Sequence, residues 1–243
     1  MSAHATLATT RRLLGQLRHD PRTVALILVV PLVLLGLLKL LLQDDEATFQ
    51  RVGAPLLGIF PLTVMFLVTS VTMLRERTGG TLERLMTMPM SRADLVTGYA
   101  LAFALLAALQ ALIASAFAIG LLGLDVEGSN AALIGVAVLN AVLGMAFGLG
   151  LSSLATTEFQ AVQFMPAFIL PQFLLCGLLI PRSQMAPALD TLAGVLPMTY
   201  AYEALSDVAA GDGAAAAGAA AVTLGFCLLG LGLGALTLRR RTG

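Results

Sequence analysis

Residues 23–42 read TVALILVVPLVLLGLLKLLL, and Lys39 is the one charged residue in this stretch. A helix of about 20 mainly apolar residues is long enough to cross the hydrocarbon core of a bilayer. The stretch is followed by the acidic residues Asp44, Asp45 and Glu46, whereas a secretory signal ends in a small-residue cleavage site. We therefore expect a permanent membrane-spanning helix here.

Five more stretches of this kind follow, in a chain that is 58% hydrophobic and 12% charged. Soluble domains contain about 25% charged residues, so the composition indicates a membrane protein. The fold class that we predict is an all-α membrane protein with six transmembrane helices in one domain, residues 23–238. The predicted spans are 23–42, 52–74, 95–123, 131–155, 159–180 and 214–238.

Basic residues orient these spans, because cytoplasmic loops are enriched in Lys and Arg. An even number of spans puts both termini on one side, and a cytoplasmic N-terminus places most basic residues in the cytoplasm, including the predicted tail, residues 239–243. The cytoplasmic residues are Arg11, Arg12, Arg18, Arg22, Arg75, Arg77, Arg84, Arg92, Arg239, Arg240 and Arg241. Arg51 and Arg182 face outward. Lys39 either extends its stem to the outer headgroups or presents a charge to a substrate.

Local signals support these boundaries. Asp20 before Pro21 is typical of a helix start, and Ser91 with Asp94, like Thr157 with Gln160, has the spacing of a capping box. Upstream, residues 1–22 contain an apolar stripe with arginines beside it, which predicts a short helix in the inner membrane interface. The stripe is Thr10, Leu13, Leu14 and Leu17, and the arginines are Arg11, Arg12 and Arg18.

The sequence lacks the residues needed for ATP hydrolysis, for catalysis by histidine and for metal binding within the membrane. A P-loop requires a lysine at the phosphates, and the chain's single lysine, Lys39, lies in a leucine run. The two histidines, His4 and His19, precede the first span, so no histidine is available for catalysis or zinc binding at membrane depth. Cys176 and Cys227 have no nearby Cys or His. We expect no enzymatic activity, metal or cofactor in this chain.

Ion-coupled transport also lacks its usual groups. Carriers of this class place acidic or basic residues inside the membrane, but no predicted span contains an acidic residue. Glu158 lies closest, at the inner end of the fifth span, where a solvated loop position is the simpler interpretation. If the protein moves a substrate, we expect another subunit to supply the energy.

The cytoplasmic segment 75–98 reads RERTGGTLERLMTMPMSRADLVTG. Gly79 and Gly80 end the preceding helix, and the pattern predicts a short amphipathic helix over residues 81–88. Leu82, Leu85 and Met86 form its apolar face, with Glu83 and Arg84 opposite. Such a helix can fit a groove on a partner. An interfacial helix with no partner is the alternative.

The outer segment 181–213 is long for a simple connection and has a helical apolar stripe broken at Pro197. A second short segment with Tyr200 and Tyr202 follows. We predict a re-entrant helix pair between the fifth and sixth spans, with its backbone shielded by protein.

Both segments resemble signatures of the type-2 ABC exporter permeases, a family that includes daunorubicin/doxorubicin-type antibiotic export permeases. The cytoplasmic resemblance rests on Arg75, Glu76, Gly80, Thr81, Leu82, Glu83, Arg84, Leu85, Pro89, Ser91, Leu95 and Gly98. The outer resemblance rests on Gly177, Pro181, Pro187, Leu196, Pro197 and Tyr200. Two departures are Thr78, where a second acidic residue is expected, and Ala188 with Leu189, where an aromatic is expected.

The resemblance implies a bacterial plasma-membrane exporter with two permeases, identical or related, and two ATP-binding subunits that hold ATP and Mg. It implies coupling to the ATPase through Arg75, Glu76, Thr81, Leu82, Glu83, Arg84 and Leu85. It places the first, second and fifth helices on a substrate path whose candidates are Phe60, Met65, Phe66, Gln163, Phe164, Phe168, Gln172 and Phe173. Lipid or neighbouring helices are the alternative contacts for these aromatic side chains.

The cargo class follows from the lack of charge along this path, which favours a hydrophobic or amphipathic molecule such as a drug, an antibiotic or a lipid. Efflux and antibiotic resistance are the roles implied. Two other classes stay open: an ion-coupled or passive carrier without an ATPase, and a non-transporting membrane scaffold or immunity protein.

Overall fold

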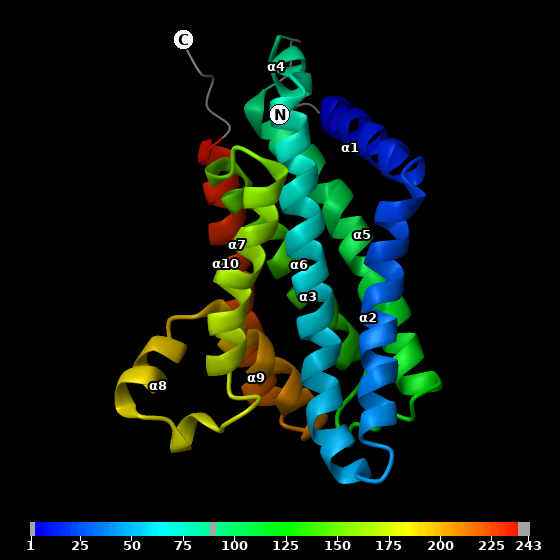
Figure 1. Ribbon diagram of the computed structural model, residues 1–243, viewed down its shortest axis with the longest axis vertical. Coiled ribbons are helices and arrows are strands. Elements are labelled where there is room, and N and C mark those ends of the chain that lie inside the picture. The colour runs from blue at the N-terminus through cyan, green and yellow to red at the C-terminus, as the bar shows by residue number, and fades with distance from the viewer. Residues whose placement is uncertain (1–2, 88–90, 238–243) are drawn as a thin grey trace.

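The protein is an all-α bundle in the computed structural model, which describes residues 3–87 and 91–237 (Figure 1). The long helices are α2 Pro21–Leu41, α3 Glu46–Thr78, α5 Arg92–Gly120, α6 Asn130–Leu151, α7 Glu158–Leu175 and α10 Gly213–Thr237. The shorter ones are α1 Ala3–Arg18, α4 Thr81–Met86, α8 Pro187–Ala193 and α9 Pro197–Ala209, with 3-10 turns η1 Ser152–Leu154 and η2 Arg182–Gln184. The predicted tail 239–243 lies outside the described residues.

Five of the described helices are long and apolar enough to cross a membrane: α2, α3, α5, α6 with η1, and α10. The predicted fifth span, 159–180, corresponds to α7, which lies alongside α3 but is not among these five (Figure 1). Its glutamines, its two prolines and Glu158 lower the hydropathy of the helix. It also ends at Leu175, because Gly177 takes a left-handed φ of 104° that breaks the helix.

The helix starts follow the predicted caps. The Asp20 carboxylate accepts a hydrogen bond from the Thr23 amide, and Ser91 and Asp94 form the expected capping box. At α7, Thr157 accepts from the Gln160 amide, but the Gln160 side chain accepts from Thr156, one residue before the expected partner. The predicted second span began at residue 52, whereas α3 begins at Glu46 because Asp45 caps it.

The centre of the bundle is the contact between α3 and α6. In the membrane-spanning part of α3, 67% of the residues are buried, compared with 17% in α2 and 22% in α10. Gly144 and Gly148 permit the close approach, since a Cβ on Gly144 would lie 2.0 Å from the Leu62 carbonyl oxygen. This GxxxG pair therefore packs two helix backbones together.

Helix α1 is present as predicted, and part of its apolar stripe packs against the rest of the protein. Leu13 and Leu17 are buried and α1 packs against α5, where the Thr10 hydroxyl donates to the Gly98 carbonyl at 3.0 Å. A Cβ on Gly98 would lie 2.7 Å from the Thr9 Cβ, so glycine is what lets the helices meet. Part of the stripe therefore packs on protein, and the position of α1 in the inner membrane interface stays a prediction.

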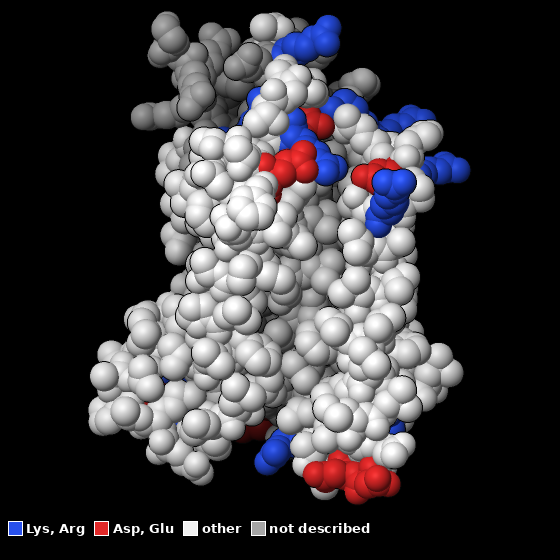
Figure 2. All heavy atoms as spheres, viewed as in Figure 1, with Lys and Arg blue, Asp and Glu red and all other residues white. Residues whose placement is uncertain are grey.

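The two ends of the bundle differ in charge. Helices α1 and α4 and the end of α10 share one end, where most blue side chains gather in Figure 2. An acidic group marks the other end, where α2 turns into α3 (Figures 1 and 2). Lys39 binds Glu46 at that turn and lies 4.3 Å from the centre of the Phe49 ring. Its ammonium therefore reaches the end of the bundle opposite α1 and α4 (Figure 1).

Candidate functional site

The segment proposed to couple to a partner forms helix α4 and projects beyond the bundle (Figure 1). It follows α3 after two glycines, and Gly80 takes a left-handed φ of 70°, which reverses the chain direction. The helix ends at Met86, two residues earlier than the predicted 81–88, and residue 88 lies outside the described part. The Thr87 hydroxyl donates to the Arg84 carbonyl at this end.

The described side chains of α4 differ in their exposure to solvent. Leu85 is half-buried against the core of the bundle, Thr81 is half-buried, and Arg84 is exposed. The side chains of Leu82 and Glu83 lie outside what the structure describes. Helix α4 therefore offers an exposed charge while one leucine holds it to its own bundle.

Arg75, in the last turns of α3, does not extend toward α4 but binds Glu158 at the start of α7. Arg75 Nε and Nη2 each donate to one carboxylate oxygen at 2.9 Å. The hydrogen bonds from Arg75 lower the pKa of Glu158. Both side chains are more than half exposed, at 55% and 53%, so the pair stabilises the contact by about 0.2–1 kcal/mol.

The neighbouring residue, Glu76, turns the opposite way into a buried cluster. Its carboxylate accepts from both Arg12 Nη atoms, at 3.3 and 3.2 Å, and from the Tyr99 hydroxyl at 2.7 Å. Burial works to lower the pKa of Arg12, but the hydrogen bonds and charge of its partners raise it above its ordinary value. Removing one partner of a buried ion pair costs about 3–5 kcal/mol.

Glu76 thus joins α1, α3 and α5 of its own chain through its carboxylate. Arg12 and Tyr99 are the residues that sequence reasoning missed. Arg12 lies 64 positions from Glu76, so no local spacing could have revealed the contact. Arg12 had been read as one more cytoplasmic charge.

The candidate path residues do not converge on one surface. Met65 and Phe66 are fully buried in α3, and Phe60 is half-buried. On α7, Gln163 is exposed and Phe164 and Phe173 are half-buried. The structure brings together Phe66, Phe168 and Gln172, and leaves the others on separate faces.

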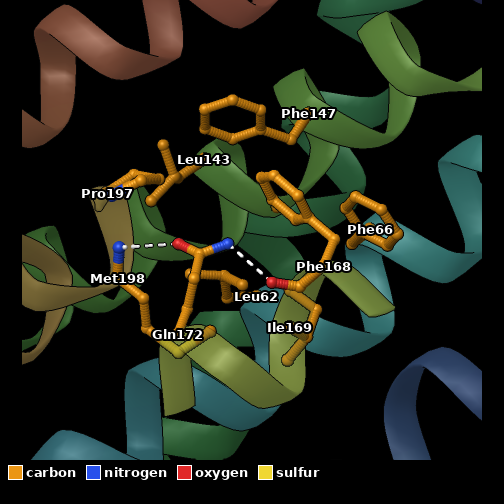
Figure 3. Close-up of a pocket in the computed structure, with 10 residues that line it drawn as sticks. Leu62, Phe66, Leu143, Phe147, Phe168, Ile169, Gln172, Pro197 and Met198 are labelled. Atoms are coloured by element: carbon orange, nitrogen blue, oxygen red, sulfur yellow. Dashed lines mark hydrogen bonds between the residues drawn. The ribbon is translucent and has the colours of Figure 1, made fainter. Parts of the chain in front are cut away.

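These three residues border a small cavity between α3, α6, α7 and α9 (Figure 3). The Phe66 and Phe168 rings are stacked at 5.6 Å, with Phe147 at 5.3 Å from Phe168. The cavity measures about 10 Å³, which is room for roughly one water molecule. The aromatic cluster formed by Phe66, Phe147 and Phe168 therefore leaves no room for a drug-sized molecule at this place.

The Gln172 amide is already engaged inside the protein. Its Nε2 donates to the Phe168 carbonyl at 2.8 Å, and its Oε1 accepts from the Met198 amide at 3.3 Å (Figure 3). Gln172 had been predicted to face a substrate. In this structure the side chain ties α7 to the first turn of α9, and its contact with a substrate stays a prediction.

The outer signature residues shape the turn between α7 and α10. Gly177 breaks the helix, Pro181 precedes η2, and Pro197 begins α9 after a break from α8. The Tyr200 hydroxyl donates to the Gly194 carbonyl at 2.7 Å. A helix, a break and a second helix therefore occupy the predicted segment.

Arg182 holds this outer segment together, and sequence reasoning had counted it only as an outward charge. Its Nε donates to Asp190 and its Nη1 to Glu203, each at 2.8 Å. The two acids come from α8 and α9. One guanidinium thus fixes the angle between both short helices.

The sequence is similar to one protein family and to individual transporter proteins. The profile of the family described as "ABC-2 type transporter" matches residues 4–209. "Probable multidrug ABC transporter permease YbhR" of Escherichia coli (strain K12) is 31% identical over 136 residues, which are 56% of this chain and 37% of that protein. "ABC transporter G family member 20" of Dictyostelium discoideum is 27% identical over 141 residues, 58% of this chain and 19% of that protein. The chain thus matches well under half the length of these relatives.

Proposed function

The chain belongs to the ABC-2 type transporter family as a membrane permease without ATPase activity of its own, and from this premise we propose that it forms the transport path of an ATP-driven exporter. A separate ATP-binding subunit, present in two copies, would bind ATP and Mg. A second permease, identical or related, would complete the path. We place the assembly in a bacterial plasma membrane.

The position of α4 is the observation that carries this proposal. A short helix projects beyond the bundle at its arginine-rich end, directly after the longest helix, α3 (Figure 1). The glycine pair before α4 separates this short helix from α3, and the Leu85 side chain packs it against the core. A partner that pressed on Thr81, Leu82, Glu83, Arg84 and Leu85 would thereby move α3.

The proposed topology has six spans, with α7 as the fifth and both termini in the cytoplasm. Support comes from α7 lying beside α3 and from the charge difference between the two ends of the bundle. Helices α8 and α9 would then form the re-entrant pair on the outer side. The exposed leucines and valine of α8 and its flanks, Leu189, Leu192 and Val195, suit contact with the outer leaflet.

The proposed cargo is a hydrophobic or amphipathic molecule, a drug or a lipid. The cavity beside Phe66 and Phe168 is apolar, and the Escherichia coli relative carries the word multidrug in its name. The exposed face of α7, which includes Gln163 and Leu170, would lie on the path between two permeases. Phe60, Met65, Phe164, Gln172 and Phe173 remain candidate path residues under this proposal.

Co-purification and reconstitution test the proposal. An ATP-binding chain should copurify with the permease, and the reconstituted complex should hydrolyse ATP faster when a hydrophobic substrate is added. Arg84→Glu, an exposed charge reversal on α4, should reduce this stimulation at least about tenfold, a loss equivalent to about 1.4 kcal/mol of coupling. Arg51→Glu, an exposed reversal at the opposite end, is the control and should leave it unchanged. Substrate pumping by the permease alone would contradict the proposal.

A further inference from the structure

The cytoplasmic end of α3 is attached to its neighbours in two unequal ways. On one side, Glu76 lies buried among Arg12 of α1 and Tyr99 of α5. On the other side, Arg75 forms an exposed ion pair with Glu158 of α7. We call the first contact the clamp and the second the latch. Solvent and salt screen an exposed pair far more than a buried one.

The apolar contacts on the two sides of α3 also differ in extent. The α1 and α5 side of α3 belongs to the main core of the bundle, with Leu13, Leu95 and Tyr99 among its buried members. The inner end of α7 meets α3 through a separate small cluster whose buried members are Leu74, Ala155 and Ala161, with Val71 and Phe164 partly buried against them. Two of these three side chains are single methyl groups. This separate cluster has far fewer buried members than the main core on the α1 and α5 side, so less apolar burial stabilises the inner half of α7 against α3.

The outer half of α7 is held much more firmly. Phe168 stacks on Phe66, Ile169 and Cys176 are buried in the main core, and Gln172 binds the start of α9. Pro166 separates the two halves, and its ring removes the backbone hydrogen bond to the Val162 carbonyl. The helix thus has an inner half held by the small cluster, by Met165 on the main core and by the latch, then a proline, and then a more firmly anchored outer half.

We propose that the inner half of α7, residues 158–165, is a releasable arm that swings away from α3 about Pro166 when the latch opens, while the clamp keeps α1 and α5 attached to α3. Movement of α4 reaches the latch through the last turn of α3. Opening exposes the inner side of the aromatic cluster, Phe66, Phe147 and Phe168. Under the proposed function, this arm is the cytoplasmic entry gate for the hydrophobic substrate.

Cysteine labelling of the isolated permease tests the arm without an ATPase. Ala161→Cys places a thiol in the small cluster between α7 and α3, and Thr9→Cys places one between α1 and α5, both at buried positions. The native Cys176 and Cys227 are buried, so the unmodified chain serves as the blank for a water-soluble maleimide. When closing is fast, the labelling rate reports the population of the open form.

Opening the latch should raise the labelling rate of Ala161→Cys and leave that of Thr9→Cys unchanged. Glu158→Gln should raise the labelling rate of Ala161→Cys about threefold. Raising NaCl from about 0.05 to about 0.5 M should do the same with Glu158 intact and add nothing in the Glu158→Gln background. Thr9→Cys should label slowly throughout. Glu46→Gln is the matched control, because it neutralises an exposed ion pair at the other end of the bundle.

A charge swap separates the latch from a general loosening of the bundle. Arg75→Glu combined with Glu158→Arg should restore slow labelling of Ala161→Cys. Unchanged labelling after Glu158→Gln, or an equal rise at Thr9→Cys, would overturn the proposal. If Ala161→Cys fails to fold, Leu74→Cys probes the same interface from α3.

The gate itself is tested with the ATP-binding subunit bound. ATP should change the labelling rate of Ala161→Cys at least about threefold and leave Thr9→Cys unchanged. A transporting complex in which ATP changes neither rate would refute the gate. If no ATP-binding subunit associates with the wild-type permease, the proposed function fails, whereas the labelling of the isolated permease still decides the arm.

Discussion

A buried glutamine, Gln110, satisfies a backbone carbonyl that Pro31 leaves free inside the bundle. Pro31 has no N–H, so the Ile27 carbonyl in α2 has no helical partner. Gln110 of α5 donates its Nε2 to that carbonyl at 2.8 Å, and its side chain is buried. One amide thus stabilises a proline-containing helix against its neighbour.

Gln110→Leu should therefore destabilise the protein although the leucine is more apolar. The Ile27 carbonyl would be left buried without a partner, which costs about 1–3 kcal/mol. The midpoint of thermal unfolding in detergent measures the effect. Gln163→Leu, at an exposed position on α7, is the control. Equal stability of the two variants would contradict this role of Gln110.

The clamp makes a second prediction at this scale. Tyr99→Phe removes the hydroxyl that donates to Glu76 and accepts from Arg12, and should lower the free energy of unfolding by about 1–2 kcal/mol. Glu76→Ala should cost more, about 3–5 kcal/mol, because it leaves a partly buried guanidinium unpaired. Arg75→Gln, in the exposed latch, should cost less than about 1 kcal/mol. A larger loss for Arg75→Gln than for Glu76→Ala would reverse our assignment of clamp and latch.

At the scale of helices, hydropathy and local capping were sufficient to place most of the bundle. Asp20 and Ser91 cap their own helices, so their signals lie within a few residues of the boundary that they set. The end of α7 was missed because Gly177 adopts a positive φ, which the apolar run 176–180 does not reveal. The stripe of α1 was correct as a pattern, but a pattern does not say whether lipid or α5 covers it.

The backbone contact between α3 and α6 can be tested with one methyl group. Gly144→Ala would place a Cβ 2.0 Å from the Leu62 carbonyl oxygen, so the helices must separate, at a cost of about 1–3 kcal/mol. Gly135→Ala adds the same methyl in the same helix where no atom lies within 4 Å. Thermal unfolding should show a lower midpoint for Gly144→Ala alone. Similar midpoints for both variants would contradict the close packing.

Across the whole molecule, the coupling and path residues could be predicted only in part. Helix α4 followed from its local pattern, because a glycine pair and an amphipathic run are sequence signals. The sequence did not reveal that Arg75 and Glu76 point in opposite directions. Their partners, Glu158 and Arg12, come from distant parts of the chain. Gln172 looked like a ligand contact because its tertiary partner, the Met198 amide, carries no mark in the sequence.

The assembled bundle has a buried centre and exposed apolar sides. Helices α3 and α6 form the interior, whereas α2 and α10 expose apolar faces that suit lipid or a second permease. The short helix α4 lies at one end of the bundle, and the cavity beside Phe168 measures only about 10 Å³. Work done at α4 by a partner is what we expect to open that cavity.

Transport by reconstituted vesicles tests this expectation most directly. Inside-out vesicles should accumulate a fluorescent hydrophobic drug only when they contain the permease, the ATP-binding subunit and ATP together, and removal of any one should reduce accumulation to the level of empty vesicles. Accumulation by vesicles that hold the permease without the ATP-binding subunit would contradict the central claim that this chain is a transport path driven by a separate ATPase.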